Sequence, residues 1–133
     1  MNYNQKYEPK GNRVIHGAGQ SPEAFSKYWK AVEDYKPAIY MTYAKIQKIE
    51  HWINKIKIEL KDYPNIMLQI GFKLLAEGDG DITPEILEGK YDKEIDDFLN
   101  TVKELKNPTF LRIGYEFDKK GKYNPKSFVK AWK

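Results

Sequence analysis

The chain has 133 residues, of which 41% are hydrophobic and 14% aromatic, enough apolar material for one folded domain with a core. It contains no apolar run of the roughly 18 residues that a membrane span needs, and no signal peptide is visible, so the compartment stays open. The lack of cysteine excludes disulfides, thiolate metal ligands and a thiol nucleophile. Because lysines alternate with acidic residues, the net charge of +4 predicts a solvated surface, with neither nucleic acid nor membrane as a partner.

Short apolar runs alternate with amphipathic stretches along the chain. After a polar leader over residues 1–12, we expect a short strand at residues 14–16 and then a glycine-containing loop. Ser21 and Pro22 are residue types of an N-cap and a first helical position, which predicts that a helix begins there. A second strand is expected at residues 38–43.

The apolar positions between residues 46 and 60 recur every three or four residues, which predicts the clearest helix of the chain. The nearly continuous apolar run at residues 66–72 predicts a third strand, and another strongly periodic helix is expected over residues 92–105. A fourth strand is expected at residues 109–117. Asn124, followed by a proline, predicts the start of a last helix.

The stretch between the third strand and its helix, residues 77–89, is acidic and rich in glycine. Acids at alternate positions are able to bind calcium, but Ile82 stands where a calcium loop of the EF-hand type requires glycine. We therefore expect a long solvated loop here, and no metal.

Strands that alternate with helices predict an α/β fold with a parallel sheet, because parallel neighbours need a covering connection between them. Neither a Gly-x-Gly-x-x-Gly motif nor a P-loop follows the first strand, which argues against a nucleotide-binding sheet. Two architectures fit the pattern: an open doubly wound sheet, and part of an eight-stranded barrel.

The fourth strand carries charge on one face. In an extended strand Arg112, Gly114 and Glu116 point to the same side, opposite an apolar face. Such charges are costly in a sheet covered on both sides unless they pair or face a wet cavity. The C-terminal mouth of a barrel offers that cavity, and a buried ion pair between Arg112 and Glu116 is the alternative.

Three other residues are candidates for the same rim. His16 and Tyr43 are expected at the C-terminal ends of the first two strands, and Gln69 lies on the third. Because equivalent strand ends of a parallel barrel meet at one face, we expect these side chains near Glu116.

These segments resemble barrel glycoside hydrolases of family 26, the β-mannanase family of clan A. The spacing Arg-x-x-x-Glu of Arg112 and Glu116 is the main point of similarity, and Tyr115 stands where mannanases usually have histidine. The matching segments are residues 16–20, 40–43, 110–117, 123–125 and 128–132.

The resemblance implies that residues 1–133 are a single partial domain, the first four strand-helix units of a TIM (β/α)8 barrel. It implies that Glu116 is the general acid/base of a retaining hydrolase, a role that asks for a raised pKa, and that the nucleophile comes from the seventh strand, outside this chain. The expected substrate is a β-linked poly- or oligosaccharide such as mannan, xylan or glucan. The residues expected to bind it are His16, Tyr43, Gln69, Arg112, Tyr115 and Tyr123.

We expect no cofactor, and no activity from these residues without the second half of the barrel. The resemblance also implies an extracellular enzyme of polysaccharide degradation. A different class of function fits as well: a non-catalytic carbohydrate-binding or scaffold protein that closes a barrel by homodimerisation, because a half-barrel leaves sheet edges uncovered.

Overall fold

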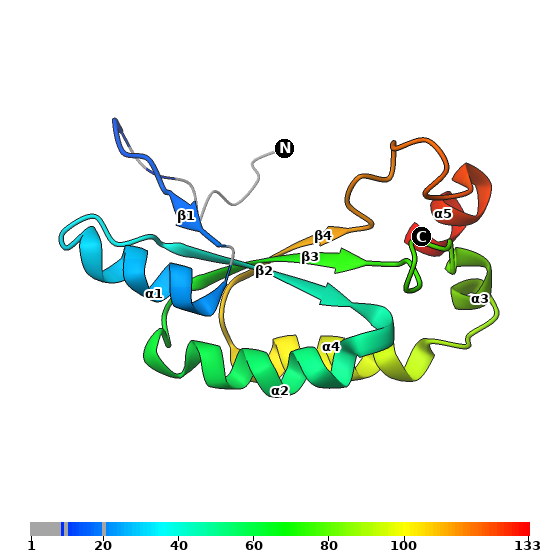
Figure 1. The fold of residues 1–133 in the computed structure, drawn as a ribbon, viewed down its shortest axis with the longest axis horizontal. Coiled ribbons are helices and arrows are strands. Elements are labelled where there is room, and N and C mark those ends of the chain that lie inside the picture. The colour runs from blue at the N-terminus through cyan, green and yellow to red at the C-terminus, as the bar shows by residue number, and fades with distance from the viewer. Residues whose placement is uncertain (1–8, 10, 20) are drawn as a thin grey trace.

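The computed structural model describes residue 9 and residues 11–19 and 21–133, so most of the expected polar leader lies outside it. Four strands form one parallel sheet, and each strand pairs with the next one along the chain (Figure 1). The strands are β1 (Gly17–Ala18), β2 (Ile39–Lys45), β3 (Met67–Lys73) and β4 (Thr109–Ile113). The α/β class with a parallel sheet is therefore confirmed, and the strand order lacks the reversal of a doubly wound sheet.

The helices lie in two places. Figure 1 shows α1 (Pro22–Ala31), α2 (Ile49–Glu59) and α4 (Asp92–Leu105) on one side of the sheet, and α3 (Thr83–Leu87) and α5 (Pro125–Trp132) beyond the C-terminal ends of the strands. Short 3-10 turns precede and follow α2, at Ile46–Lys48 and Leu60–Asp62. No helix of the described residues covers the other face of the sheet, which we call the open face. None of these helices is long and apolar enough to cross a membrane.

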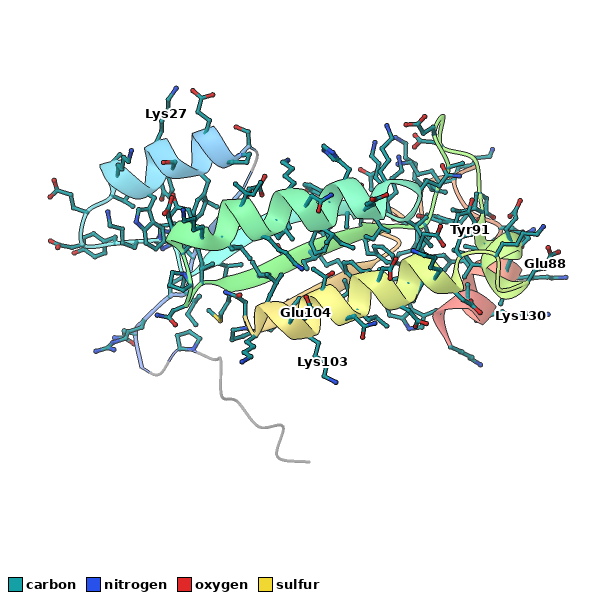
Figure 2. All side chains as sticks on the ribbon, turned by 90° about the horizontal axis from the view of Figure 1, so that it is seen from below. Lys27, Glu88, Tyr91, Lys103, Glu104 and Lys130 are labelled. Carbon is teal, nitrogen blue, oxygen red and sulfur yellow. The ribbon has the colours of Figure 1, made fainter. Side chains whose placement is uncertain are left out.

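The core lies between the sheet and this helix layer. Alternate residues of β2 and β3 point toward the helices and are buried, whereas their neighbours point to the open face. In the centre the ring of Phe98 stacks on Phe72 at 4.4 Å and contacts Trp52 at 5.2 Å. Charged side chains such as Lys27, Lys103 and Glu104 are exposed on the helix layer (Figure 2).

The two predicted capping residues act as expected. The hydroxyl of Ser21 accepts a hydrogen bond from the amide of Ala24, and the side-chain oxygen of Asn124 accepts from the amides of Lys126 and Ser127. A proline follows each cap, so α1 and α5 begin at the predicted positions.

The acidic stretch is more ordered than predicted, because it contains α3. The carboxylate of Asp81 accepts hydrogen bonds from the amide of Thr83 at 3.0 Å and from its hydroxyl at 2.7 Å, which starts the helix. The other oxygen of Asp81 accepts from the amide of Asn124 at 2.7 Å. Asp81 therefore fastens α3 to the beginning of α5. No cluster of acids and histidines able to hold a metal ion occurs in the part of the chain that the structure describes.

The fourth strand is shorter than predicted and ends at Ile113. Gly114 has a φ of +60° and Glu116 a φ of +58°, so the chain leaves the extended conformation and turns. A Cβ at Gly114 would clash with Cε2 of Phe128, so α5 packs against the backbone at this position. The predicted alternation therefore fails beyond Ile113.

The first strand is displaced from residues 14–16 to Gly17–Ala18. Gly17 pairs with Ile39, and a Cβ on it would lie 2.9 Å from the Cβ of Ile39. The two strands approach this closely because residue 17 lacks a side chain.

Candidate functional site

Three residues form a row across the open face near the C-terminal end of the sheet. In the strand register, Tyr43 of β2 lies opposite Gly71 of β3, which lies opposite Arg112 of β4. Two positions further along the strands, Lys45 lies opposite Lys73. Because residues two apart on a strand share a face, all of these side chains belong to the open side.

A pair of tyrosine rings lies above Gly71. The rings of Tyr43 and Tyr115 meet at 5.3 Å with an interplanar angle of 64°. A Cβ at Gly71 would lie 2.7 Å from Cδ1 of Tyr43 and 3.2 Å from Cδ1 of Tyr115. The two rings therefore occupy the space that any side chain at residue 71 would fill. Tyr43 remains 46% exposed, so the pair is accessible from the open face.

Arg112 lies beside this tyrosine pair. Its guanidinium carbon is 5.9 Å from the centre of the Tyr115 ring, a cation–π arrangement. The side chain is exposed, and among the described residues it forms no ion pair with Glu116 or any other carboxylate. The alternative of a buried Arg112–Glu116 ion pair is therefore wrong.

Two other ion pairs border the site. Lys122 pairs with Glu116, and Lys73 pairs with Asp79. The side chains of Lys73 and Lys122 are only 16% and 14% exposed, whereas their carboxylate partners are about half exposed. In each pair the lysine side chain is therefore mostly buried, and the carboxylate is the group exposed to solvent.

These pairs set the protonation of the acids. The hydrogen bond and positive charge of Lys122 hold the pKa of Glu116 below its ordinary value, and Lys73 does the same for Asp79. The raised pKa expected at Glu116 is therefore wrong for the site formed by these residues alone. In this arrangement Glu116 is an ionised group, able to accept a proton or to bind a cationic or hydroxyl group.

The structure brings together only part of the predicted site. Tyr43, Arg112 and Tyr115 are in contact or in register, Glu116 follows directly, and Gln69 lies on the open face one row further from the strand ends.

His16 and Tyr123 lie elsewhere. His16 precedes β1 and meets the ring of Tyr28 in α1 at 6.2 Å, on the helix side of the sheet. Tyr123 is 8% exposed and packs on Phe128 at 4.9 Å, and burial raises its pKa to about 12. His16 is half-buried against α1 and Tyr123 is buried against Phe128 of α5, so neither side chain belongs to the exposed row on the open face.

Sequence reasoning missed Gly71, Lys73, Asp79 and Lys122. The alternation along β3 could have found Lys73, because it shares the parity of Gln69 and Gly71, but the predicted strand stopped one residue short. Asp79 and Lys122 come to the site from loops, and no local pattern in the sequence predicts their pairing.

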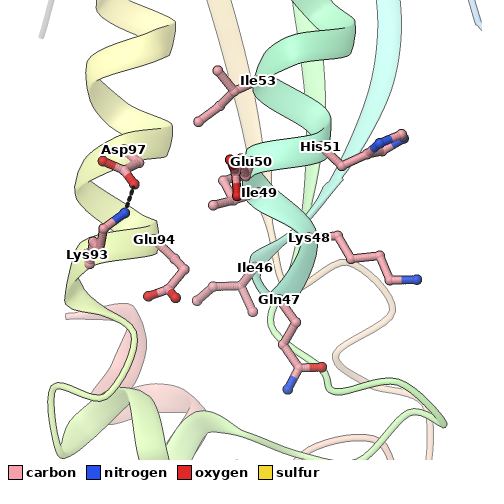
Figure 3. A pocket seen from close by; sticks show the side chains of 10 residues that line it. All are labelled: Ile46, Gln47, Lys48, Ile49, Glu50, His51, Ile53, Lys93, Glu94 and Asp97. Atoms are coloured by element: carbon pink, nitrogen blue, oxygen red, sulfur yellow. Dashed lines mark hydrogen bonds and ion pairs between the residues drawn. The ribbon is translucent and has the colours of Figure 1, made fainter.

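A separate groove lies between α2 and α4, on the far side of the sheet from Tyr43. It has a volume of about 530 Å³, and Figure 3 shows Lys93 paired with Asp97 on one wall while His51 points away from α4. The polar groups here are surface charges that do not converge on one point, so the row on the open face is the better candidate site.

Neither a scan against models of protein families nor a search of curated proteins finds a match to this chain. Its function is therefore inferred from the residues themselves.

Proposed function

We propose that this chain is part of a barrel glycoside hydrolase that acts on a β-linked polysaccharide, and that the open-face row at the strand ends belongs to its sugar-binding site. The observation that carries the proposal is the exposed Tyr43–Tyr115 pair above Gly71, with Arg112 and Glu116 beside it. Ligand sites commonly combine aromatic walls with a few converging polar groups. Active sites of α/β barrels lie at this end of the strands.

The sheet supports the barrel part of the proposal. In a (β/α)8 barrel every strand pairs with the next one, and all helices lie outside. The order β1-β2-β3-β4 and the single helix layer agree with that plan. The open face would then be part of the barrel interior, which explains why it carries Met41, Met67 and Phe110 as well as polar residues. Further strand-helix units would cover it.

Glu116 is the proposed acid/base. A retaining hydrolase needs a second carboxyl group roughly 5 to 5.5 Å away, which attacks the sugar. A second carboxylate at that distance would raise the pKa of Glu116 and oppose Lys122, so the acid role depends on the completed barrel. The residues described here supply the proton-transfer group and part of the sugar site, but not the nucleophile.

The test is hydrolysis of β-mannan, xylan and mixed-linkage glucan by the polypeptide that carries both barrel halves. Glu116→Gln should reduce the rate by about 10²- to 10⁴-fold, the usual contribution of general acid/base catalysis. Asp118→Asn is the matched control, because Asp118 is an exposed acid two residues away without an ion pair among the described residues, and this variant should retain activity. Normal activity in the Glu116→Gln variant would refute the assignment.

A second candidate is a carbohydrate-binding half-barrel that homodimerises. It is favoured by the edge strand β4, which pairs with β3 alone among the strands of the described residues and where Leu111 is 37% exposed. Two copies related by a two-fold axis would place β4 of each beside β1 of the other and keep all strands parallel. Sedimentation of the 133-residue chain distinguishes the two candidates: a compact, cooperatively unfolding dimer supports the homodimer, and a monomer supports the longer barrel.

A further inference from the structure

The open-face site has an excess of positive charge. Three carboxylates border it, and each is paired with a lysine: Glu77 with Lys48, Asp79 with Lys73, and Glu116 with Lys122. Lys45, Arg112 and Lys119 remain without a carboxylate partner among the described residues. Counted over the residues that the structure describes, six cations against three anions leave +3 around the tyrosine pair, and the exposed loop residues Asp118 and Lys120 cancel each other.

The unpaired cations share the electrostatic environment of the site. Lys45 lies opposite Lys73 on the open face. Each acid has its pKa lowered mainly by the lysine that pairs with it, and the unpaired lysines add to this: Lys45 at Glu77, and Lys119 at both Asp79 and Glu116. All three acids are therefore ionised at neutral pH, and yet the site remains positive. A neutral sugar would not use this charge.

Arg112 is the best placed of these cations. It lies in register with Gly71 and Tyr43 and over the ring of Tyr115, so a sugar on the tyrosine pair would have the guanidinium at its side. A planar guanidinium matches a carboxylate with two parallel hydrogen bonds, and within the described ranges no carboxylate pairs with that of Arg112.

We propose that this site takes an acidic saccharide, a β-linked sugar bearing a carboxylate such as a uronic acid, with Arg112 binding the carboxylate and the tyrosine pair carrying the ring. This inference rests on the proposed carbohydrate function and names the class of sugar. Lys45 and Lys119 contribute long-range attraction, which weakens with salt.

The experiment compares two ligands that differ only at C6. The 133-residue chain is titrated by calorimetry with a β-1,4-linked glucuronic acid trisaccharide and with cellotriose, each at low and high salt, and with acetate as a free carboxylate. We expect at least tenfold tighter binding of the uronate, with a preference that shrinks at high salt.

Two variants locate the effect. Arg112→Gln should reduce uronate affinity by about tenfold to a hundredfold and cellotriose affinity by much less, because it removes the charged hydrogen-bond donor that only the carboxylate needs. Arg112→Lys keeps the positive charge but loses the two parallel hydrogen bonds of the guanidinium, so its uronate affinity should lie between that of the unaltered chain and that of Arg112→Gln. Lys103→Gln, which removes an exposed cation on α4, is the control and should bind like the unaltered chain.

The outcomes separate this inference from the proposal on which it rests. Equal affinity for the two trisaccharides, or full uronate affinity in Arg112→Gln, overturns the acidic-sugar assignment and leaves a carbohydrate site standing. Acetate binding as tightly as the uronate overturns it as well, because the anion alone would then be the ligand. Binding of neither saccharide overturns the carbohydrate site itself.

Discussion

Gly71 is the residue on which the geometry of the tyrosine pair depends, and replacing it with alanine tests that geometry. The added Cβ would lie 2.7 Å from Cδ1 of Tyr43, whereas carbon atoms in contact lie about 3.5–4.0 Å apart, so the ring has to move by roughly 0.8 Å or more. The same atom would be 3.2 Å from Cδ1 of Tyr115, a smaller conflict. The pair cannot keep its present arrangement in Gly71→Ala.

The cost to folding should nevertheless be small. Overpacking a closed core costs about 1–3 kcal/mol, but Tyr43 is 46% exposed and can swing toward solvent. Gly71 has an extended backbone that alanine tolerates, and the substitution also stiffens the unfolded chain, worth about 0.4–1 kcal/mol in the opposite direction. We therefore expect the free energy of unfolding to change by less than about 1 kcal/mol, measured by urea denaturation.

Saccharide affinity should fall by about tenfold, because one of the two rings leaves its place. Gly80→Ala is the matched control: a Cβ there would lie 3.6 Å from the Cβ of Ala76, an ordinary contact, so stability and affinity should both persist. Unchanged affinity in Gly71→Ala would refute the assignment of the tyrosine pair to the sugar site, and a large loss of stability would show that the rings are part of the core.

Two further predictions concern the core and the ion pair. Phe98→Ala should lower the free energy of unfolding by about 3–5 kcal/mol in urea titrations, because Phe98 is 1% exposed between Phe72 and Trp52, and a loss below 1 kcal/mol would contradict this packing. In an NMR pH titration, Lys122→Gln should raise the pKa of Glu116 toward its ordinary value, and an unchanged pKa would mean that the pair does not form in solution. Since Lys122 lowers the folded-state pKa of Glu116, the contribution of this pair to stability is present above the unfolded-state pKa and is lost as the pH falls through the folded-state pKa.

The fold class and the long helices could be predicted because their signals are local. The recurrence of apolar residues at intervals of three and four gave α2 and α4, and the apolar run at residues 66–72 gave β3 to within one residue. Ser21 and Asn124 marked helix starts through hydrogen bonds made within three residues. In these segments the nearest neighbours in sequence determine the conformation.

The site was harder to predict because it depends on contacts between distant residues. Gly114 turns the chain where the ring of Phe128 packs against it, and this turn carries Tyr115 from the expected apolar face to Tyr43. The displacement of β1 likewise follows from its pairing with β2, and it leaves His16 on the helix side.

The electrostatics depend on loops that fold back over the strand ends. Sequence spacing placed Glu116 next to Arg112. In the structure Glu116 pairs instead with Lys122, which comes from the following loop. Asp81 looked like part of a solvated acidic stretch, whereas its carboxylate holds Thr83 and Asn124 together. For these charged residues the sequence therefore showed which residue types are present, but it did not predict which groups they pair with.

The central claim is that sugars bind at the strand ends of the open face, and NMR chemical-shift mapping of the 133-residue chain with the glucuronic acid trisaccharide tests it most directly. We expect the largest shifts at Tyr43, Gly71, Arg112 and Tyr115, with the groove between α2 and α4 unaffected. Shifts centred on that groove around Glu50 and Glu94, or no saturable shifts at the strand ends, would contradict it.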